Sequence, residues 1–351
     1  MKSSHNMALH NFVQRLLLIG AHVQTLPPAP VPRAPAALLP LIEAIAGPHR
    51  RFDERAMLYG NRYRSGFWAI YLLSAIAVLF AVMPLALGWD SSNHLLHPFA
   101  GLWAVGEVMV IGTVSAIYWR GHRCDWQAQW LSARTTAELS WYLPMLAPLL
   151  DFSAPAGAAN WYLRVFDPGQ HVRGADDVAA LCAENESRAR ALLLDAWSDP
   201  QFVSSYAQWT IDILDEQRHY HYRIASKHHA LRHRVHVMNS TLFGLTAVGA
   251  LLHLMVHTFF LSVITTFFPA LGASLHGALA QSESYRLGTT SERLVADLQD
   301  AMTRIRTAFD ESVSAGDVAA LKAAIEAAIA LILEEHQDWH LLVRPHNLPL
   351  A

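Results

Sequence analysis

Histidines are the side chains of this sequence whose spacing comes nearest to a chemical site. Among its 20 histidines, Glu216 and His219 form a Glu-x-x-His pair on an expected helix. Three more share one face of that helix: His229, His233 and His236. A carboxylate-bridged dimetal centre in a helical bundle needs a second Glu-x-x-His pair, and the sequence offers only His336 and His340 as another close pair. We therefore expect no metal and no cofactor, with the histidines solvated or beside lipid headgroups.

Glu107 is the second residue with chemical potential, because it is the only acidic residue well inside a long apolar run. An ionisable group at that depth costs roughly 2.5 kcal/mol or more, so it should face water or the protein interior. One interpretation is a pore or ion-path residue. The other is a protonated or hydrogen-bonded glutamate packed between helices, against Tyr71 or Ser74. The sequence leaves both interpretations open.

Hydroxyl side chains recur in the last apolar run at spacings of three and four residues, which places them on one helix face. A face of this kind lines a water path or forms a packing seam, since small and hydroxyl residues let helices in lipid approach closely. The candidate pore-lining residues are Glu107, Thr258, Ser262, Thr265 and Thr266.

Four apolar helices are needed to position these residues. The runs 67–87 and 98–119 are each about 20 residues long, which matches a ~30 Å bilayer core at ~1.5 Å per residue. No Lys or Arg occurs between Ser65 and Trp119, nor between Arg234 and Arg286. The second of these intervals holds the apolar stretch 237–277, broken only around 253–257. The sequence therefore predicts two transmembrane hairpins.

The basic residues predict the orientation of these spans. All 26 Lys and Arg residues lie outside the two intervals, before the first span of each hairpin or after the second. Positive charge is retained on the cytoplasmic side of bacterial membranes. We expect both termini and the central segment to be cytoplasmic, with only the two short hairpin turns outside.

Composition narrows the functional classes. The hydrophobic fraction of 53% and the charged fraction of 16% differ from a soluble domain in the membrane direction. A net charge of −3 gives no argument for nucleic acid. The sequence lacks a phosphate-binding loop, a Gly-x-Ser-x-Gly elbow, Cys-x-x-Cys and Gly-x-Gly-x-x-Gly, which removes any positive case for an enzyme.

We predict an all-α polytopic membrane protein without sheets, in which cytoplasmic helices continue into the spans. Residues 1–49 form an N-terminal segment with a proline-rich linker, and 50–150 and 200–312 each hold a hairpin with flanking helices. Residues 151–199 connect the two, and 313–351 form a last helix. A helix from Trp126 should end at Pro144 and Pro148, and Asp199 should cap a long helix that begins at Pro200.

A weak internal repeat supports this division. Phe52-Asp-Glu-Arg55 before the first span matches Leu214-Asp-Glu-Gln217 before the third, and Thr135-Thr-Ala-Glu138 after the second matches Thr289-Thr-Ser-Glu292 after the fourth. The unit would be helix, two spans, helix. Chance similarity is the alternative explanation for such short matches.

These motifs, taken together, resemble the SLATT-type family of bacterial membrane effectors, which are associated with nucleotide-synthesising and nucleotide-sensing domains. The resemblance covers about residues 49–310. It rests on six segments: His49-Arg-Arg-Phe-Asp-Glu-Arg55, Tyr63-Arg64, the stretch 126–138, Asn160-Trp-Tyr-Leu-Arg164, the stretch 214–223 and Phe268-Pro-Ala-Leu-Gly-Ala-Ser274.

The resemblance implies a homo-oligomeric effector of anti-phage defence in the bacterial inner membrane, which opens a pore or disrupts the bilayer. Its partners would be lipid and a nucleotide second messenger or soluble sensor protein. Larger relatives carry an N-terminal Rossmann-like sensor, and residues 12–24 look like its opening strand. Two other hypotheses stay open: a membrane-anchored metal-dependent enzyme using the His-rich helix, and a passive scaffold that docks a soluble partner.

Overall fold

The computed structural model describes residues 8–21, 23–87, 89, 97–150, 175–256, 258–282 and 284–342. Within these ranges the chain is helical and contains no strand, as the sequence predicts. The first hairpin turn with Ser91 and the motif Asn160–Arg164 lie outside the described residues.

Two very long helices organise the molecule: α2 (Leu39–Ala86, 48 residues) and α7 (Pro200–Met255, 56 residues). At ~1.5 Å per residue they measure roughly 70 and 85 Å, more than twice the thickness of a bilayer core. The start of α7 is as predicted, because the Asp199 carboxylate accepts a 2.9 Å hydrogen bond from the Gln201 N–H. The start of α2 is not. It begins eleven residues before the expected boundary at residue 50, and Pro48 lies inside it.

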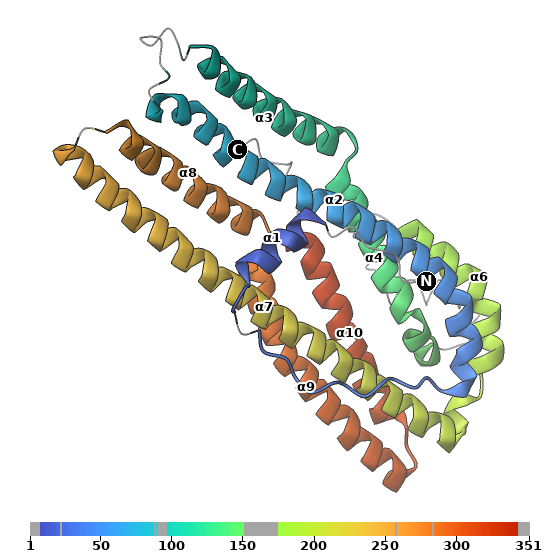
Figure 1. Cartoon of the computed structure of the whole chain (residues 1–351). Helices are drawn as coiled ribbons and strands as arrows, with labels where there is room; N and C mark the ends of the chain where they lie inside the picture. Colours follow the sequence, from blue (N-terminus) through green and yellow to red (C-terminus); the bar gives the residue numbers. More distant parts are fainter. Residues whose placement is uncertain are drawn as a thin grey trace.

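Four helices are long and apolar enough to cross a membrane: α2, α3 (His97–Arg123), α7 and α8 (Phe259–Gln281). They form one layer in the order α3, α2, α8, α7, with each helix packed against its neighbour in that order (Figure 1). Large apolar side chains cover their outer surface. Phe243 is 74% exposed and Met255 is 82% exposed, which water would disfavour and lipid would not.

Glycines allow these helices to approach closely. A Cβ atom added at Gly106 of α3 would lie 2.4 Å from the Phe80 ring of α2, and one added at Gly277 of α8 would lie 2.4 Å from the Tyr71 ring of α2. At Gly249 of α7 it would meet Ile264 of α8 at 2.9 Å. Each of the three span–span contacts therefore places a large side chain over a glycine, which is typical of helix packing in lipid.

The other end of the molecule is a helical bundle with a conventional core. It consists of the first parts of α2 and α7 with α4 (Trp126–Leu146), η2 (Ala147–Leu149), α6 (Ala175–Leu193), η3 (Ala196–Ser198), α9 (Ser284–Ala315) and α10 (Ala319–Leu342). Leu41, Leu143, Leu214, Leu298 and Ile329 are fully buried in it. The predicted end of α4 is half right: Pro148 lies in η2 beyond the helix, but Pro144 lies inside α4.

A second apolar cluster joins the bundle to the span layer. Aromatic side chains dominate it, with Tyr63 stacked on Trp130 at 5.7 Å and Phe67 and Trp68 fully buried. Trp130 lies over Gly60, where an added Cβ would be 2.7 Å from the indole. α4 is thereby held directly against α2 just before the first span.

The N-terminal segment lies across this junction. α1 (Leu9–Leu17) packs on α2 and α7, and residues 23–35, here called the strap, run from it past α7 to η1 (Ala36–Leu38) and the start of α2 (Figure 1). The expectation of an opening sensor strand at 12–24 is wrong, because α1 is a helix and no strand follows it in the described residues. The apolar residues recur at helical spacing: Leu9, Phe12, Val13 and Leu16.

Candidate functional site

Glu107 lies half-buried on α3, beside the close contact of Gly106 with Phe80 of α2. Among the described residues it makes no hydrogen bond or ion pair that would neutralise it. The two partners considered from sequence are engaged elsewhere: Ser74 donates to the Ile70 carbonyl at 2.8 Å, and Tyr71 packs on Gly277. The carboxyl group therefore has no partner on α2 that would account for it.

The hydroxyl residues of the last span share one helix side by spacing but differ in exposure. Thr258 is the N-cap of α8 and is exposed, as is Thr266, whereas Ser262 and Thr265 are half-buried. Thr265 donates to the Leu261 carbonyl at 3.1 Å. Its methyl group, like Ile264, points to Gly249 of α7. Thr265 is thus a packing residue as well as a hydroxyl residue.

A single chain does not bring these two sets together. Glu107 is on α3 and the hydroxyl residues are on α8, and α2 lies between these helices in the layer (Figure 1). Convergence of the candidate pore residues on one axis would require more than one copy of the chain.

A cavity of about 600 Å³ lies at the junction between the span layer and the bundle. Four helices, α2, α4, α7 and α9, form its walls, and the strap closes it on one side. We call it the junction cavity. Its polar and charged lining residues are Thr25, Arg64, Arg134, Thr135, Glu138, Glu216, Gln217, His219, Tyr220, His221, Arg223, His228 and Ser291.

Arg64 is the central cation of the junction cavity. Its Nε donates to the Gly60 carbonyl at 3.2 Å, and its guanidinium lies 5.1 Å from the Trp130 ring. It makes no ion pair with a carboxylate of the described residues. Burial lowers the pKa of Arg64, and neighbouring Arg134 lowers it further against an opposing effect of Tyr220. A half-buried guanidinium without a counter-ion is costly unless an anion neutralises it.

The other arginines of the cavity differ in their pairing. Arg134 forms an ion pair with Glu138 and lies 3.9 Å from the Asp53 carboxylate. Arg223 lies over the Tyr220 ring at 6.0 Å and has no ion pair within the described part of the chain. The second lining carboxylate, Glu216, is exposed. The cavity thus has positive charge that its own carboxylates do not fully neutralise.

The His-rich helix α7 contributes three histidine side chains to the same cavity, and of these His219 was singled out from the sequence. His219 Nδ1 lies 2.6 Å from the Asp215 carbonyl oxygen, and His221 Nδ1 lies 3.3 Å from the Ser291 hydroxyl. His228 has a buried Nδ1 with no hydrogen-bond partner. Burial, assisted by the positive charges of Lys227, His229 and Arg64, lowers the pKa of His228 to about 4. At neutral pH this imidazole is neutral and has an unused polar atom.

Further positive charge surrounds the cavity. Burial lowers the pKa of Lys227, and so do Arg64, Arg15 and Arg223, in that order. Burial also lowers the pKa of His10 on α1 to about 4, with further contributions from Arg64 and Lys227. Cations from α1, α2 and α7 therefore repel one another at the base of the spans.

The described residues contain no group of three or more His, Cys, Asp or Glu side chains arranged to hold a metal ion. Glu216 and His219 both line the junction cavity, but His229 instead approaches the Glu292 carboxylate at 3.4 Å. Side chains 334–342, which include His336 and His340, are outside the description. The arrangement favours anion binding over metal binding.

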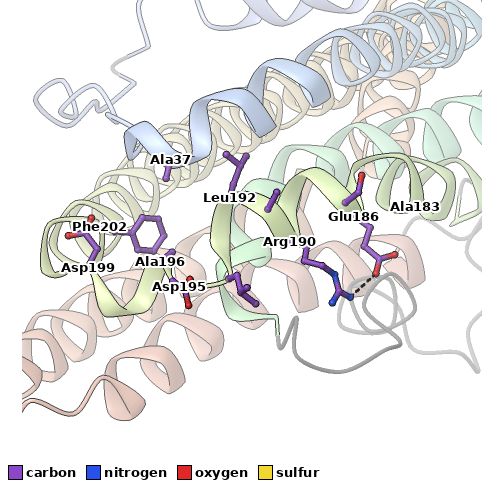
Figure 2. Close-up of a pocket in the computed structure, with 12 residues that line it drawn as sticks. Ala37, Ala183, Glu186, Arg190, Leu192, Asp195, Ala196, Asp199 and Phe202 are labelled. Carbon is purple, nitrogen blue, oxygen red and sulfur yellow. Dashed lines mark hydrogen bonds and ion pairs between the residues drawn. The ribbon is translucent and has the colours of Figure 1, made fainter.

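A second hollow of about 700 Å³ lies on the bundle surface between α6 and the start of α7. Its lining is mostly small and apolar. Figure 2 shows Glu186 and Arg190 turned toward each other, and their ion pair measures 3.5 Å. The other charged lining residues, Asp195 and Asp199, are acidic and the one arginine is paired, so this groove carries a weaker case for an anionic ligand than the junction cavity.

Comparison of the chain with protein-family models, curated proteins and solved structures finds no match in any of the three. The SLATT-type resemblance therefore stays an expectation from sequence.

Sequence reasoning singled out Glu216 and His219 but not the unpaired arginines beside them. One signal was available. The repeat motifs contain Thr135, Glu138, Glu216 and Ser291, and all four line the junction cavity. Motifs of the predicted repeat thus lie in the region where α2, α4, α7 and α9 meet.

Proposed function

We propose that this protein is a homo-oligomeric effector of the bacterial inner membrane that opens a pore or disrupts the bilayer in anti-phage defence, under control from the cytoplasm. The continuity of α2 and α7 carries the proposal. Each helix is part of the buried bundle core at one end and of the apolar layer at the other. A change in bundle packing therefore shifts the spans without any intervening loop.

The proposal includes two transmembrane hairpins of common origin, with both termini cytoplasmic. Its support is the matching order of packing: α2 contacts α3 and α4, and α7 contacts α8 and α9. The connection between α7 and α8 is short, 256–258, which suits an external turn. The repeat motifs at the base of each unit agree with this arrangement.

The proposed pore would form between copies of the chain. Glu107 lacks a neutralising partner among the described residues of its own chain, and α3 is one of the two edge helices of the layer (Figure 1). A ring of copies would place this carboxyl group against water or a neighbouring chain, which is the usual environment of an ionisable residue in a membrane. Carboxylate rings favour cations over anions.

Ion flux from loaded liposomes tests this function. Purified full-length protein should release potassium when activated, and Glu107→Gln should reduce the preference for cations, whereas Ser115→Ala on an exposed part of the same helix should not. A cysteine at Ser262 should react with a water-soluble thiol reagent and one at Phe260 should not; Ile264 is a poor control because it packs on Gly249.

Absence of flux from correctly inserted protein would favour the scaffold hypothesis. The defence role has a separate test. Bacteria that express the protein with its neighbouring genes should give fewer plaques than bacteria expressing Glu107→Lys. Equal plaque counts would remove the defence role and leave the membrane activity standing.

A further inference from the structure

We propose that the junction cavity is a binding site for a phosphate-bearing small molecule of nucleotide size, taken up from the cytoplasm and held chiefly by Arg64 and Arg223. This inference assigns the chemistry of the cytoplasmic signal. The effect of the ligand on gating rests on the proposed function, whereas binding of the ligand is independent of that function.

The first support is the unneutralised charge. Arg64 on α2 and Arg223 on α7 line the cavity from two different helices, and neither pairs with a carboxylate of the described residues. A guanidinium presents donors in a planar fork that matches two phosphate oxygens. The paired Arg134–Glu138 and the exposed Glu216 complete the charged lining. An anion between Arg64 and Arg223 would neutralise the two side chains that have no partner.

The second support is the enclosure and its walls. A volume of about 600 Å³ falls within the usual range of roughly 300–1,000 Å³ for small-molecule sites. Apolar and aromatic side chains, among them Leu26, Trp130, Tyr220 and Leu287, share the lining with the polar groups. Such a mixture accommodates a molecule with a phosphate at one end and a flat apolar ring at the other better than it accommodates free phosphate.

The third support is an unused polar atom. His228 lines the cavity, is neutral at physiological pH, and has a buried Nδ1 without a hydrogen-bond partner in the described chain. A buried polar atom without a partner costs about 1–3 kcal/mol. A polar ligand group in the cavity would recover this energy once the imidazole ring turns Nδ1 toward it.

The location gives the ligand a mechanical role. Arg64 precedes the first apolar run by three residues, and Arg223 lies on α7 before its apolar run. Both helices continue into the membrane layer. An anion that contacts both arginines replaces repulsion between α2 and α7 by attraction, which changes the spacing of two spans at their cytoplasmic ends.

Binding is tested on full-length protein in nanodiscs of phosphatidylcholine, with pyrophosphate and ATP as probes and isothermal calorimetry as the measurement. We expect ATP to bind more tightly than pyrophosphate. Arg64→Ala should weaken binding about tenfold or more, because it removes charge-assisted hydrogen bonds. Arg62→Ala, which alters an exposed arginine two residues away on the same helix, should leave it unchanged.

Two further variants test the site if Arg64→Ala fails to fold: Arg64→Lys and Arg223→Ala. Lysine retains the charge and loses the fork, so it should bind with intermediate affinity. Nanodiscs that contain phosphatidylglycerol distinguish the source of the phosphate: competition by this lipid that Arg64→Ala abolishes would assign the site to a headgroup. If folded wild-type protein binds neither the probes nor the anionic lipid, the inference is wrong. Ion flux from a protein that does not bind the probes would reject only the ligand site in the junction cavity. Binding of the probes by a protein without ion flux would reject only the proposed pore.

Discussion

The helix triplets α2–α3–α4 and α7–α8–α9 have the same order of packing but different surroundings. α8 lies inside the layer, where it contacts both α7 and α2, whereas α3 lies at its edge beside α2 (Figure 1). Three close glycine contacts join the layer, and two of them involve α8. Each triplet therefore supplies one inner and one edge helix of the layer, but the inner helix is the long α2 in the first triplet and the short α8 in the second.

The two triplets also differ in charge at the junction. If they are aligned on Asp53-Glu54 and Asp215-Glu216, Arg64 of the first triplet corresponds to Ser226 of the second. Ser226 accepts a 2.8 Å hydrogen bond from the Gln24 N–H of the strap. At this aligned position the first triplet thus has a cation that lines the junction cavity, whereas the second has a hydroxyl group that binds the segment closing it.

If the two triplets are alike, both should cross the membrane in the same direction. This is the largest expected effect, because a reporter at each turn is either active or silent. A reporter active only in the periplasm should be active when inserted at Ser91 or next to Val256, and silent when fused to Ala351. The reason is that Lys and Arg flank the bases of both triplets and not their turns. Activity at only one of the two turns would show that the triplets cross the membrane differently.

Core leucines test whether the two triplets share one folding unit. Leu143 of α4 and Leu298 of α9 are both fully buried in the same cluster. Replacing either by alanine should lower the free energy of unfolding by about 2–5 kcal/mol, through lost burial and a residual cavity. Denaturant unfolding in detergent is the measurement, and Leu194→Ala, at an exposed site, is the control. Two separate transitions would contradict a shared core.

The glycine contacts test the central place of α8. Gly277→Ala, between the triplets, and Gly106→Ala, within the first, should each lower stability by about 1–3 kcal/mol because the new methyl group meets an aromatic ring. Gly112→Ala on α3 has open space around it and should be neutral or slightly stabilising. Thermal unfolding in detergent measures all three. If Gly277→Ala resembles Gly112→Ala, α8 does not pack closely on α2.

The smallest expected effect concerns the docking of α1 on the first triplet. His10 is buried, its ring lies 3.2 Å from the Ser65 hydroxyl, and burial with Arg64 and Lys227 lowers its pKa to about 4. As the pH falls, His10 is therefore protonated near pH 6.5 in the unfolded chain but only near pH 4 in the folded chain. Stability should be full above pH 6.5 and should fall between pH 6.5 and 4.

His10→Gln should reduce the loss of Tm between pH 7 and pH 5 relative to wild type. Part of this loss should remain in the variant, because the pKa of His228 is lowered in the same way. An unchanged loss would show that the proton is taken up elsewhere.

The sequence predicted the parts of the fold that depend on local pattern. The four apolar helices, the cap at Asp199 and the break near residues 253–257 all follow from composition and spacing over a few turns. The start of α2 does not. Pro40 suits the first turn of a helix, but Pro48 argues against a helix interior, and burial of Leu41 and Ile45 in the bundle core favours the helix nevertheless.

The junction cavity could not be predicted for a different reason. Its lining runs from Thr25 to Ser291, so its composition depends on how four helices and the strap are placed side by side. The pairing of Arg134 with Glu138 follows from a spacing of four residues. The lack of a partner for Arg64 is a property of the packed molecule and has no signature in the sequence.

The strap has a consequence for how far the parts of the molecule can separate. It connects α1, whose apolar side chains Leu9, Phe12 and Leu16 are exposed at the base of the spans, with Leu38, which is fully buried in the bundle. A stretch such as 23–35 reaches at most roughly 45 Å. Its prolines prevent it from coiling into a helix, and Gln24 binds it to α7. A displacement of α1 away from the bundle beyond this reach, such as the membrane surface would cause when it thins or curves, would break the Gln24 hydrogen bonds to Ser226 and Tyr222 and open one side of the junction cavity.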